Sequence, residues 1–233
     1  MAAIVLAENP LFVNPWLQEI SFFDDIRPHA AAVNMAVDEA LLAVASRPVL
    51  RVYRWARPAV SFGYFERWEP VRAAYPERDA VRRWTGGGVV LHGEDFTYSL
   101  LIPISFPSAA PPPAGSYAII HRALCAALAD AGISAEAARS SSDKVSQACF
   151  ENPVLHDVLV SGIKVAGGAQ RRTRTGLMHQ GSIQSLELPG AFGPAFAARL
   201  AAAVRLEVFD VAGAAETLAA EKYGTRDWLE KRH

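Results

Sequence analysis

Apolar and polar residues alternate along several short stretches of the chain. In PVLRVYRWARPAVSFGYF, residues 48–65, one alternating run contains Leu50 and Val52, and a second contains Val60 and Phe62 after a turn at Pro58. This pattern predicts two strands joined as a hairpin or a similar meander. The segments VVLHGEDFTYSLLIPI, HDVLVSGIKVAGGAQ and GLMHQGSIQS predict further strands, so we expect a largely antiparallel sheet.

Apolar residues recur at helical spacing in other segments. NMAVDEALLAVA predicts a helix capped by Asn34, and SYAIIHRALCAALADAG predicts a helix that ends at Gly132. The run SFPSAAPPPAGS predicts a surface loop, because its prolines lack the amide donor that helix interiors and central strands need. The alanine-rich tail from Pro194 predicts helix with a break near Gly213. Together these elements predict an α+β fold, with a mixed, largely antiparallel sheet flanked by helices in a single domain over residues 1–233.

Composition narrows the function classes. The 23 basic and 24 acidic side chains nearly cancel, which argues against a dedicated nucleic-acid-binding protein. The N-terminal stretch has no basic region, and Glu8 and Pro10 interrupt its apolar run, so we expect no signal peptide and no membrane span. The two cysteines and the absence of zinc-ligand spacing predict neither disulfide nor structural metal and favour a cytoplasmic location. No apolar surface patch is evident from the sequence, so we expect a monomer.

The segment RRWTGGG, residues 82–88, places three adjacent glycines between an extended stretch and an apolar strand. It lacks the spacing of a dinucleotide-binding fingerprint and the Gly-Lys-Ser/Thr of a phosphate loop. One interpretation is a turn whose backbone amides bind a carbonyl or phosphate, assisted by Arg82 or Arg83. The other is a strained hairpin turn, because glycine tolerates positive φ. Composition leaves both open.

The segment VSGIKVAGGAQRR brings a lysine beside small residues. Lys164 precedes the run Ala166-Gly167-Gly168-Ala169, so its side chain can lean over a ligand lying on that backbone. The alternative interpretation is a solvated surface lysine.

The cysteines and histidines divide by context. Cys125 lies on an apolar helix stripe, typical of a core residue. Cys149 lies in a polar loop fifteen positions before Lys164, where a nearby ammonium would favour the nucleophilic thiolate; an ordinary loop thiol is the alternative. His92 and His179 are predicted at strand ends, where ligands are often bound, whereas the remaining histidines have no such setting.

Five motifs resemble, in order, those of the lipoate-protein ligase A and octanoyltransferase family, also called the biotin/lipoate A/B ligase family: NMAVDEALL, RRWTGGGVVLHGEDFTYSLLIP, GIKVAGGAQRR, GLMHQGSI and EKYGTRDWL. The resemblance implies a biotin/lipoyl protein ligase-like catalytic domain with a tunnel for a medium-chain acyl or lipoyl group. It implies that the tunnel is lined by Arg83, Thr85, Gly86, Gly87, Gly88, His92, Lys164, Gly167, Gly168, Ala169, His179 and Gly181. Where the family commonly has Gly-Ser-Ala or Gly-Thr-Ala, this chain has Gly167-Gly168-Ala169, so the resemblance does not imply the ligand hydrogen bond of that hydroxyl here.

Three chemistries occur in that family. Lipoate-protein ligases adenylate free lipoate with ATP and Mg²⁺ and typically carry Arg-Asn-Asp before the lysine strand, where this chain has Cys149-Phe150-Glu151-Asn152-Pro153. That segment resembles the cysteine-dependent octanoyltransferases; a related amidotransferase subgroup often has proline after the cysteine. The resemblance implies that Cys149 accepts an octanoyl group from acyl carrier protein as a thioester and that Lys164 hydrogen-bonds the acyl carbonyl.

The implied acceptor is a lysine of a lipoyl-domain protein, such as the glycine cleavage H protein or a 2-oxoacid dehydrogenase E2. No ATP, metal or redox cofactor is expected on this route. Two alternatives remain: an ATP-dependent lipoate-protein ligase, and a non-catalytic module that binds an acyl or biotin-like ligand.

Overall fold

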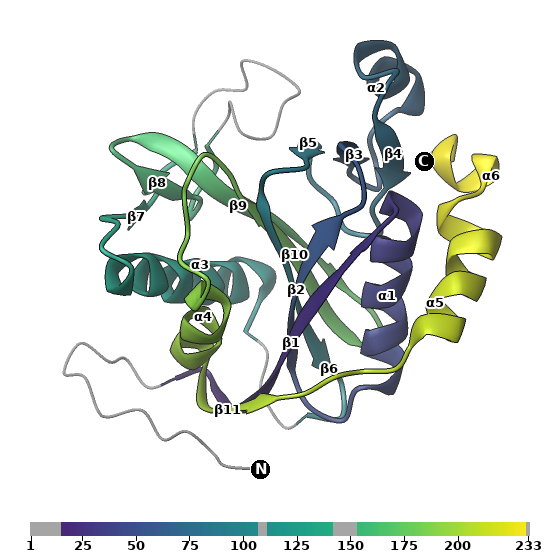
Figure 1. Cartoon of the computed structure of the whole chain (residues 1–233). Coiled ribbons are helices and arrows are strands. Elements are labelled where there is room, and N and C mark those ends of the chain that lie inside the picture. Colours follow the sequence, from purple (N-terminus) through teal and green to yellow (C-terminus); the bar gives the residue numbers. More distant parts are fainter. Residues whose placement is uncertain (1–14, 107–110, 142–152, 232–233) are drawn as a thin grey trace.

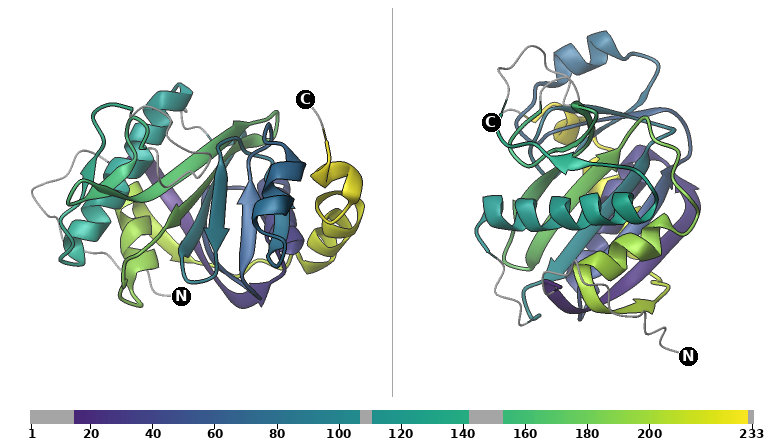
Figure 2. Two further views of the ribbon diagram at one scale, coloured as in Figure 1. Left: turned by 90° about the horizontal axis from the view of Figure 1, so that it is seen from above. Right: turned by 90° about the vertical axis from the view of Figure 1, so that its left-hand side faces the viewer.

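The computed structural model describes residues 15–106, 111–141 and 153–231, which form a large mixed sheet, a smaller sheet beside it, and helices on both faces of the large one (Figures 1 and 2). The large sheet has the strand order β11 (Ala201–Leu206), β1 (Leu17–His29), β2 (Val49–Trp55), β6 (Phe96–Pro103), β10 (Gly176–Ile183), β9 (Ile163–Arg172), β8 (Val158–Val160) and β7 (Glu136–Ala137). Strand β1 runs parallel to β11 and β2, and the other neighbouring pairs are antiparallel. The predicted mixed, largely antiparallel sheet is confirmed.

Two layers of helix cover the large sheet. On one face lie α3 (Pro113–Asp130) and α4 (Phe192–Leu200); on the other lie α1 (Ala31–Val44) and α5 (Ala212–Leu218), followed by the π-helical turn η1 (Ala219–Tyr223) and α6 (Arg226–Leu229) (Figure 2). Alternate residues of β2 face the two layers: Leu50 packs in the α3/α4 core, whereas Val49 and Tyr53 pack in the α1/α5 core. Burial on both faces agrees with the five apolar residues among the seven of this strand, and Arg51 is fully buried with them.

The smaller sheet consists of β3 (Ala59–Phe62) between β4 (Asp79–Arg82), which is parallel to it, and β5 (Val89–His92), which is antiparallel. The short helix α2 (Trp68–Ala74) packs against this sheet. The predicted hairpin of β2 and β3 is therefore wrong, because the two strands belong to different sheets, and β5 and β6 are likewise divided. The turns at Pro58 and Gly93 carry the chain from one sheet to the other.

The cap of α1 differs from the sequence prediction. The helix begins at Ala31, and the first amide that needs a partner, that of Ala31, donates to the Asp79 carboxylate at 2.9 Å. Asn34 lies inside the helix, fully buried, and its amide nitrogen donates to the carbonyl of Arg54 at 3.0 Å. The carboxylate of Asp79, from another part of the chain, thus caps the helix in place of Asn34.

Three other features of the predicted helices differ in the structure. Helix α3 begins at Pro113, inside the predicted proline-rich loop, because a proline in the first helical turn loses no hydrogen bond. Gly132, with φ +80°, follows its end, as predicted. The tail from Pro194 is not continuously helical, since β11 interrupts it through parallel pairing with β1, and Gly213 lies within α5 rather than at a break. The sequence pattern predicted no element for the residues of β1.

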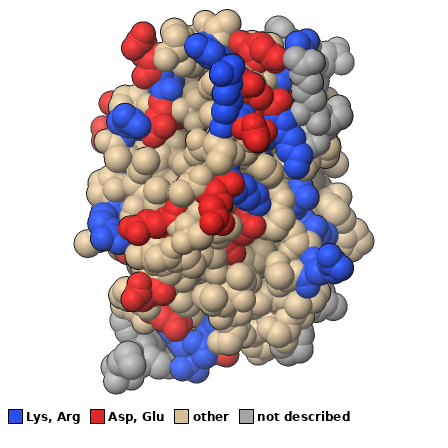
Figure 3. All heavy atoms as spheres, turned by 90° about the vertical axis from the view of Figure 1, so that its right-hand side faces the viewer, with Lys and Arg blue, Asp and Glu red and all other residues tan. Residues whose placement is uncertain are grey.

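The surface is mixed in charge where α5 and α6 lie. Basic and acidic side chains intermingle on that face (Figure 3). Within the three described ranges, no helix has both the length and the hydrophobicity that a bilayer span requires. The single domain over residues 1–233 and the monomeric state stay predictions.

Candidate functional site

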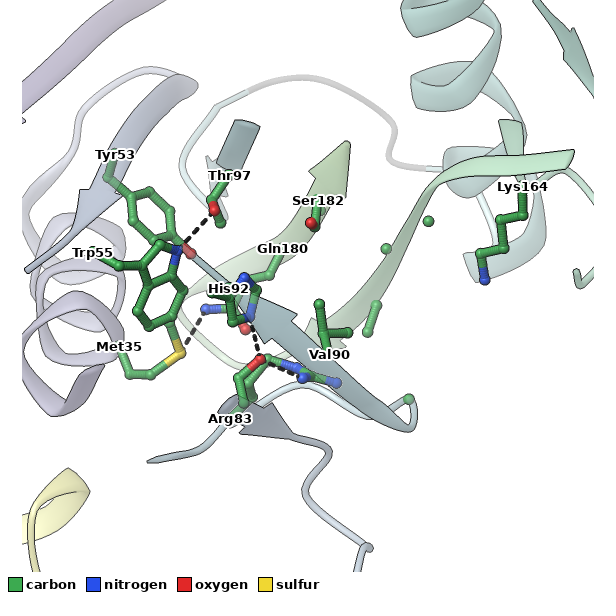
Figure 4. Close-up of a pocket in the computed structure, with 16 residues that line it drawn as sticks. Met35, Tyr53, Trp55, Arg83, Val90, His92, Thr97, Lys164, Gln180 and Ser182 are labelled. Atoms are coloured by element: carbon green, nitrogen blue, oxygen red, sulfur yellow. Dashed lines mark hydrogen bonds between the residues drawn. The ribbon is translucent and has the colours of Figure 1, made fainter. Parts of the chain in front are cut away.

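A pocket opens between the two sheets (Figure 4). The small-sheet side contributes Ser61, Arg83, Gly87, Val90 and His92; the large-sheet side contributes Tyr53, Trp55, Thr97, Lys164, Gly167, Gly168, Ala169, Gln180, Gly181 and Ser182, and α1 contributes Met35. Eight of the sequence-predicted residues line it: Arg83, Gly87, His92, Lys164, Gly167, Gly168, Ala169 and Gly181. The pocket wall therefore combines the two glycine-containing motifs, which lie far apart in the sequence.

The remaining predicted residues divide into two groups. Thr85, Gly86, Gly88 and His179 are close to the pocket in the fold but are not among its lining residues. Cys149 lies outside the described residues, so its relation to Lys164 stays a prediction.

Arg83 braces the loop of residues 84–88, which we call the glycine loop. Its guanidinium is buried, and Nη2 donates to the carbonyls of Gly86 at 3.0 Å and Gly88 at 2.8 Å. Thr85 anchors the same loop to the large sheet, since its hydroxyl donates to Oε1 of Gln180 at 2.7 Å. Arg83 and Thr85 thus hold the loop itself, which is a different task from the direct ligand contact that the family resemblance implies for them.

The glycine loop contains one left-handed residue and one close backbone contact. Gly87 has φ +84°, a conformation that costs an L-residue about 1–2 kcal/mol. Gly63, which the sequence analysis did not single out, touches the loop so closely that a Cβ there would lie 1.8 Å from the carbonyl oxygen of Gly87. A glycine immediately after a strand was the available signal for it.

His92 joins a chain of hydrogen bonds at the pocket wall. Its Nε2 lies 2.6 Å from Oγ of Ser61, and its Nδ1 lies 2.7 Å from Oδ2 of Asp95. The indole of Trp55 stacks on the imidazole, with ring centroids 4.1 Å apart. His92 ends β5, as predicted. Ser61, Asp95 and Trp55 were not predicted as site residues.

Burial and mutual interaction shift the pKa values of His92 and Asp95. Burial lowers the pKa of His92 below its ordinary value, and the neighbouring Asp95 offsets that only in part. Burial raises the pKa of Asp95, but the His92 ring and hydrogen bonds from His92, Ser182 and the Gly93 amide outweigh it, so the net pKa is lowered. Near neutral pH the pair is a neutral imidazole on a carboxylate.

Lys164 is a buried, paired cation. Its Nζ lies 2.7 Å from Oδ2 of Asp157, and only 3% of its side chain is exposed. The hydroxyl of Tyr117 donates to the other carboxylate oxygen at 2.5 Å and accepts from the Gly168 amide at 3.1 Å. The alternative interpretation of Lys164 as a solvated surface lysine is therefore wrong. Asp157 and Tyr117 were missed because neither stands in a motif; Asp157 immediately precedes β8.

The glycines on β9 and β10 make room for these side chains. A Cβ on Gly167 would lie 2.9 Å from Cε of Lys164, and one on Gly168 would lie 2.6 Å from the His179 ring. A Cβ on Gly181 would lie 2.3 Å from the ring of Tyr98. The same backbone that lines the pocket thus accommodates buried side chains by close packing.

His179 lies in the middle of β10, not at a strand end as predicted. Its imidazole packs edge-to-face against that of His121, with centroids 5.6 Å apart. Burial lowers the pKa of His121 to about 4 and that of His179 well below the ordinary value, so both rings are neutral. Since His121 is on α3 and buried, its neighbourhood with His179 depends on helix packing that no local pattern reports.

In the part of the chain that the structure describes, no group of three His, Cys, Asp or Glu side chains could hold a metal ion.

The fold is the one seen in solved lipoate protein ligases. Over 92% of this chain and 96% of the other, the structure resembles an archaeal bi-partite lipoate protein ligase from Thermoplasma acidophilum, solved with its E2 lipoyl domain, at a TM-score of 0.65 and 18% identity. This likeness establishes the fold and confirms the predicted ligase-like architecture.

The sequence comparisons establish the family. Residues 30–185 match the lipoyl protein ligase A/B catalytic domain, so the chain belongs to this family, which confirms the resemblance. It is 37% identical to octanoyltransferase LipM of Kyrpidia tusciae, over 66% of this chain and 62% of that protein. It is 40% identical to octanoyltransferase LipM of Carboxydothermus hydrogenoformans, over 69% of this chain and 63% of that protein. The chain thus spans less than two thirds of the length of these curated relatives.

Proposed function

We propose that the protein transfers an octanoyl group from acyl carrier protein to a lysine of a lipoyl-domain protein through a thioester on Cys149. The observation that carries the proposal is a pocket between the sheets that joins the glycine loop to the buried Lys164, in a chain 37–40% identical to octanoyltransferases named LipM. The E2 lipoyl domain solved with a ligase of the same fold supports a lipoyl domain as the acceptor.

The reaction has two acyl transfers. The Cys149 thiolate attacks the octanoyl carbonyl, forming a new C–S bond while the carrier thiol leaves and takes up a proton. The deprotonated amine of the acceptor lysine then attacks the Cys149 thioester, forming the amide; the amine loses a proton and Cys149 leaves as thiolate. Because the amide is more stable than the thioester, the second step is favourable without ATP, a metal or a redox cofactor.

Lys164 has the charge that this chemistry needs. An ammonium group directed at the acyl carbonyl stabilises the negative oxygen of each tetrahedral intermediate, and such stabilisation acts more strongly in a water-poor site. Its partner Asp157, at 2.7 Å, keeps the buried cation in place. Tyr117 supports Asp157 from the other side, since its hydroxyl donates to that carboxylate.

The experiment compares two cysteine variants after incubation with octanoyl carrier protein and intact mass measurement. We expect the wild type and Cys125→Ala to gain one octanoyl group and Cys149→Ala to gain none. Cys125 is a suitable control because burial raises the pKa of its thiol to about 11, so it stays protonated. Loss of the adduct in Cys125→Ala but not in Cys149→Ala would contradict the proposal.

Two further outcomes would assign another function. An adduct that requires ATP with free lipoate or octanoate, and that both cysteine variants still form, would identify a lipoate-protein ligase. Retention of octanoate with no transfer under either condition would identify a binding module.

A further inference from the structure

A buried hydrogen-bond chain connects the turn between the sheets to the glycine loop. It runs from Asp95 through His92 and Ser61 to Arg83, with distances of 2.7, 2.6 and 2.7 Å between successive side chains. We propose that this relay, Asp95–His92–Ser61, positions Arg83 and through it the glycine loop, and thereby sets which acyl chain lengths the pocket accepts. The inference rests on the proposed function, whose acyl substrate it specifies further.

With a neutral His92, the donors and acceptors of the relay permit one arrangement. Arg83 can only donate, so the Ser61 oxygen accepts from it and the Ser61 hydroxyl hydrogen is free to point at His92. Nε2 of His92 then accepts, which requires a neutral imidazole whose proton is on Nδ1. That proton is donated to the Asp95 carboxylate. Protonation of His92 would turn Nε2 into a donor, which reverses its hydrogen bond with Ser61 and adds a second positive charge near Arg83.

Asp95 fastens the relay to the large sheet. Besides His92, its Oδ2 accepts from the hydroxyl of Thr97 on β6 at 2.8 Å and from that of Ser182 on β10 at 2.6 Å. Ser61 and His92 belong to β3 and β5 of the small sheet. The relay therefore ties the two sheets together at the boundary where the pocket lies.

The other end of the relay fixes the pocket width. Arg83 holds the carbonyls of Gly86 and Gly88, and Gly87 between them faces β9 across the pocket. A Cβ on Gly87 would lie 3.4 Å from Cβ of Ala169 on β9, in ordinary van der Waals contact. At this separation, a displacement of the loop by the width of a methylene group changes the space open to an acyl chain.

The geometry resembles a Ser-His-Asp nucleophile, but positioning explains it better. Ser61 has no exposed surface, and its oxygen accepts a hydrogen bond from a guanidinium, which withdraws electron density from it. Nη2 of Arg83 donates to two carbonyl oxygens of the loop, so this end of the relay provides support for the backbone. We therefore treat these groups as positioning residues.

The experiment measures kcat/KM for octanoyl, decanoyl and dodecanoyl carrier protein, for the wild type, Ser61→Ala and Ser21→Ala. Ser21 is a matched control, because it is also a fully buried serine that donates to a carboxylate, that of Glu207, at 2.5 Å in a distant part of the sheet. We expect Ser61→Ala to reduce the discrimination between the best chain and the chain two methylenes longer by about tenfold, the effect of losing one charge-assisted hydrogen bond. Ser21→Ala should keep the wild-type profile.

Two histidine variants separate positioning from general packing. In His92→Gln the amide oxygen can occupy the place of Nε2 and accept from Ser61; in His92→Asn the amide nitrogen can occupy the place of Nδ1 and donate to Asp95. We expect His92→Gln to retain the chain-length profile and His92→Asn to lose it as Ser61→Ala does. In His92→Gln the profile should also become independent of pH on the acid side, where protonation of the wild-type imidazole reverses its hydrogen bond with Ser61 and adds positive charge near Arg83.

Three results would overturn the inference. One is an unchanged chain-length profile in Ser61→Ala, and another is a profile kept by His92→Asn but lost by His92→Gln. The third is octanoylation or fluorophosphonate labelling of Ser61, which would make it a nucleophile. If the wild type accepts no acyl group from any carrier, the proposed function fails; calorimetric binding of octanoate, decanoate and dodecanoate to the same variants then decides the inference separately.

Discussion

Two glycine-rich segments form opposite walls of one pocket, and they contain glycine for different physical reasons. In the glycine loop, Gly87 adopts φ +84°, and Arg83 satisfies the carbonyls on either side of it. At Gly167, Gly168 and Gly181 on β9 and β10 the backbone has no positive φ, and the space that a Cβ would fill holds Lys164, His179 and Tyr98. The first segment needs glycine for its backbone conformation, and the second needs it for side-chain packing. Similar composition therefore does not indicate similar function.

Among the variants that test this difference, Gly181→Ala should have the largest effect on the free energy of unfolding. The new Cβ would lie 2.3 Å from the ring of Tyr98, a fully buried side chain with little room to move. We expect the free energy of unfolding to fall by about 3 kcal/mol, the upper range for overpacking a core, measured by urea denaturation. Gly213→Ala is the control, since nothing lies within 4 Å of its Cβ and alanine in helix α5 should stabilise by about 0.5–1 kcal/mol. Equal unfolding midpoints for both variants would contradict the packing argument.

The pH dependence of stability sharpens the same comparison, because two buried histidines, His121 and His179, adjoin the second segment. Burial lowers the pKa of His121 in the folded protein to about 4, whereas its ordinary value is 6.5, so the unfolded chain binds more protons as the pH falls through this window. The contribution of His121 to the free energy of unfolding is therefore fully present above pH 6.5 and is lost as the pH falls toward 4. From pH 7 to pH 5, His121 should account for a loss of about 2 kcal/mol.

The measurement is urea unfolding at several pH values for the wild type and His121→Asn. The asparagine amide can still donate to the carbonyl of His156, which Nδ1 of His121 now bonds at 2.7 Å, but it does not titrate. The stability difference between the two proteins should narrow by about 2 kcal/mol as the pH falls from 7 to 5. A difference that stays constant would show that His121 does not titrate in this window.

The smallest effect is expected in the glycine loop itself. Gly87→Ala introduces a left-handed L-residue, which costs about 1–2 kcal/mol, and its Cβ would face Ala169 across the pocket. Gly86→Ala places its Cβ in open space, so its unfolding free energy should stay within about 0.5 kcal/mol of wild type. Octanoyl loading should fall in Gly87→Ala and persist in Gly86→Ala. Equal loss in both would mean that the loop needs glycine for something other than backbone conformation.

Three elements lie where the sequence pattern predicted them. Helix α3 ends before Gly132 as expected, and β9 and β10 follow the segments GIKVAGGAQ and GLMHQGSI. Strand β11 was predicted as helix because alanine favours helices, but pairing with β1 overrides that propensity. The same limit applies to β2 and β3, where the pattern predicts both strands but not the sheets they join.

The sequence predicted those site residues that stand in a local pattern or in a motif of the family, and it predicted no others. The sequence supplied Arg83, His92 and Lys164, and the structure assigns each of them a partner. Those partners were missed: Ser61 for Arg83, Asp95 for His92 and Asp157 for Lys164. A serine or aspartate outside a motif has no pattern that distinguishes it from surface polar residues.

The sequence by itself determined which stretches are apolar and which backbone positions lack a side chain. It also determined the order of the family's motifs, and so identified the two segments that form the pocket. Tertiary structure alone decided that one glycine segment is a braced loop and the other a packing surface. The reason is that the deciding hydrogen bonds join distant residues: Thr85 and Gln180 are 95 positions apart, and Tyr117 and Asp157 are 40 apart. Such contacts form only when the two sheets and α3 pack together.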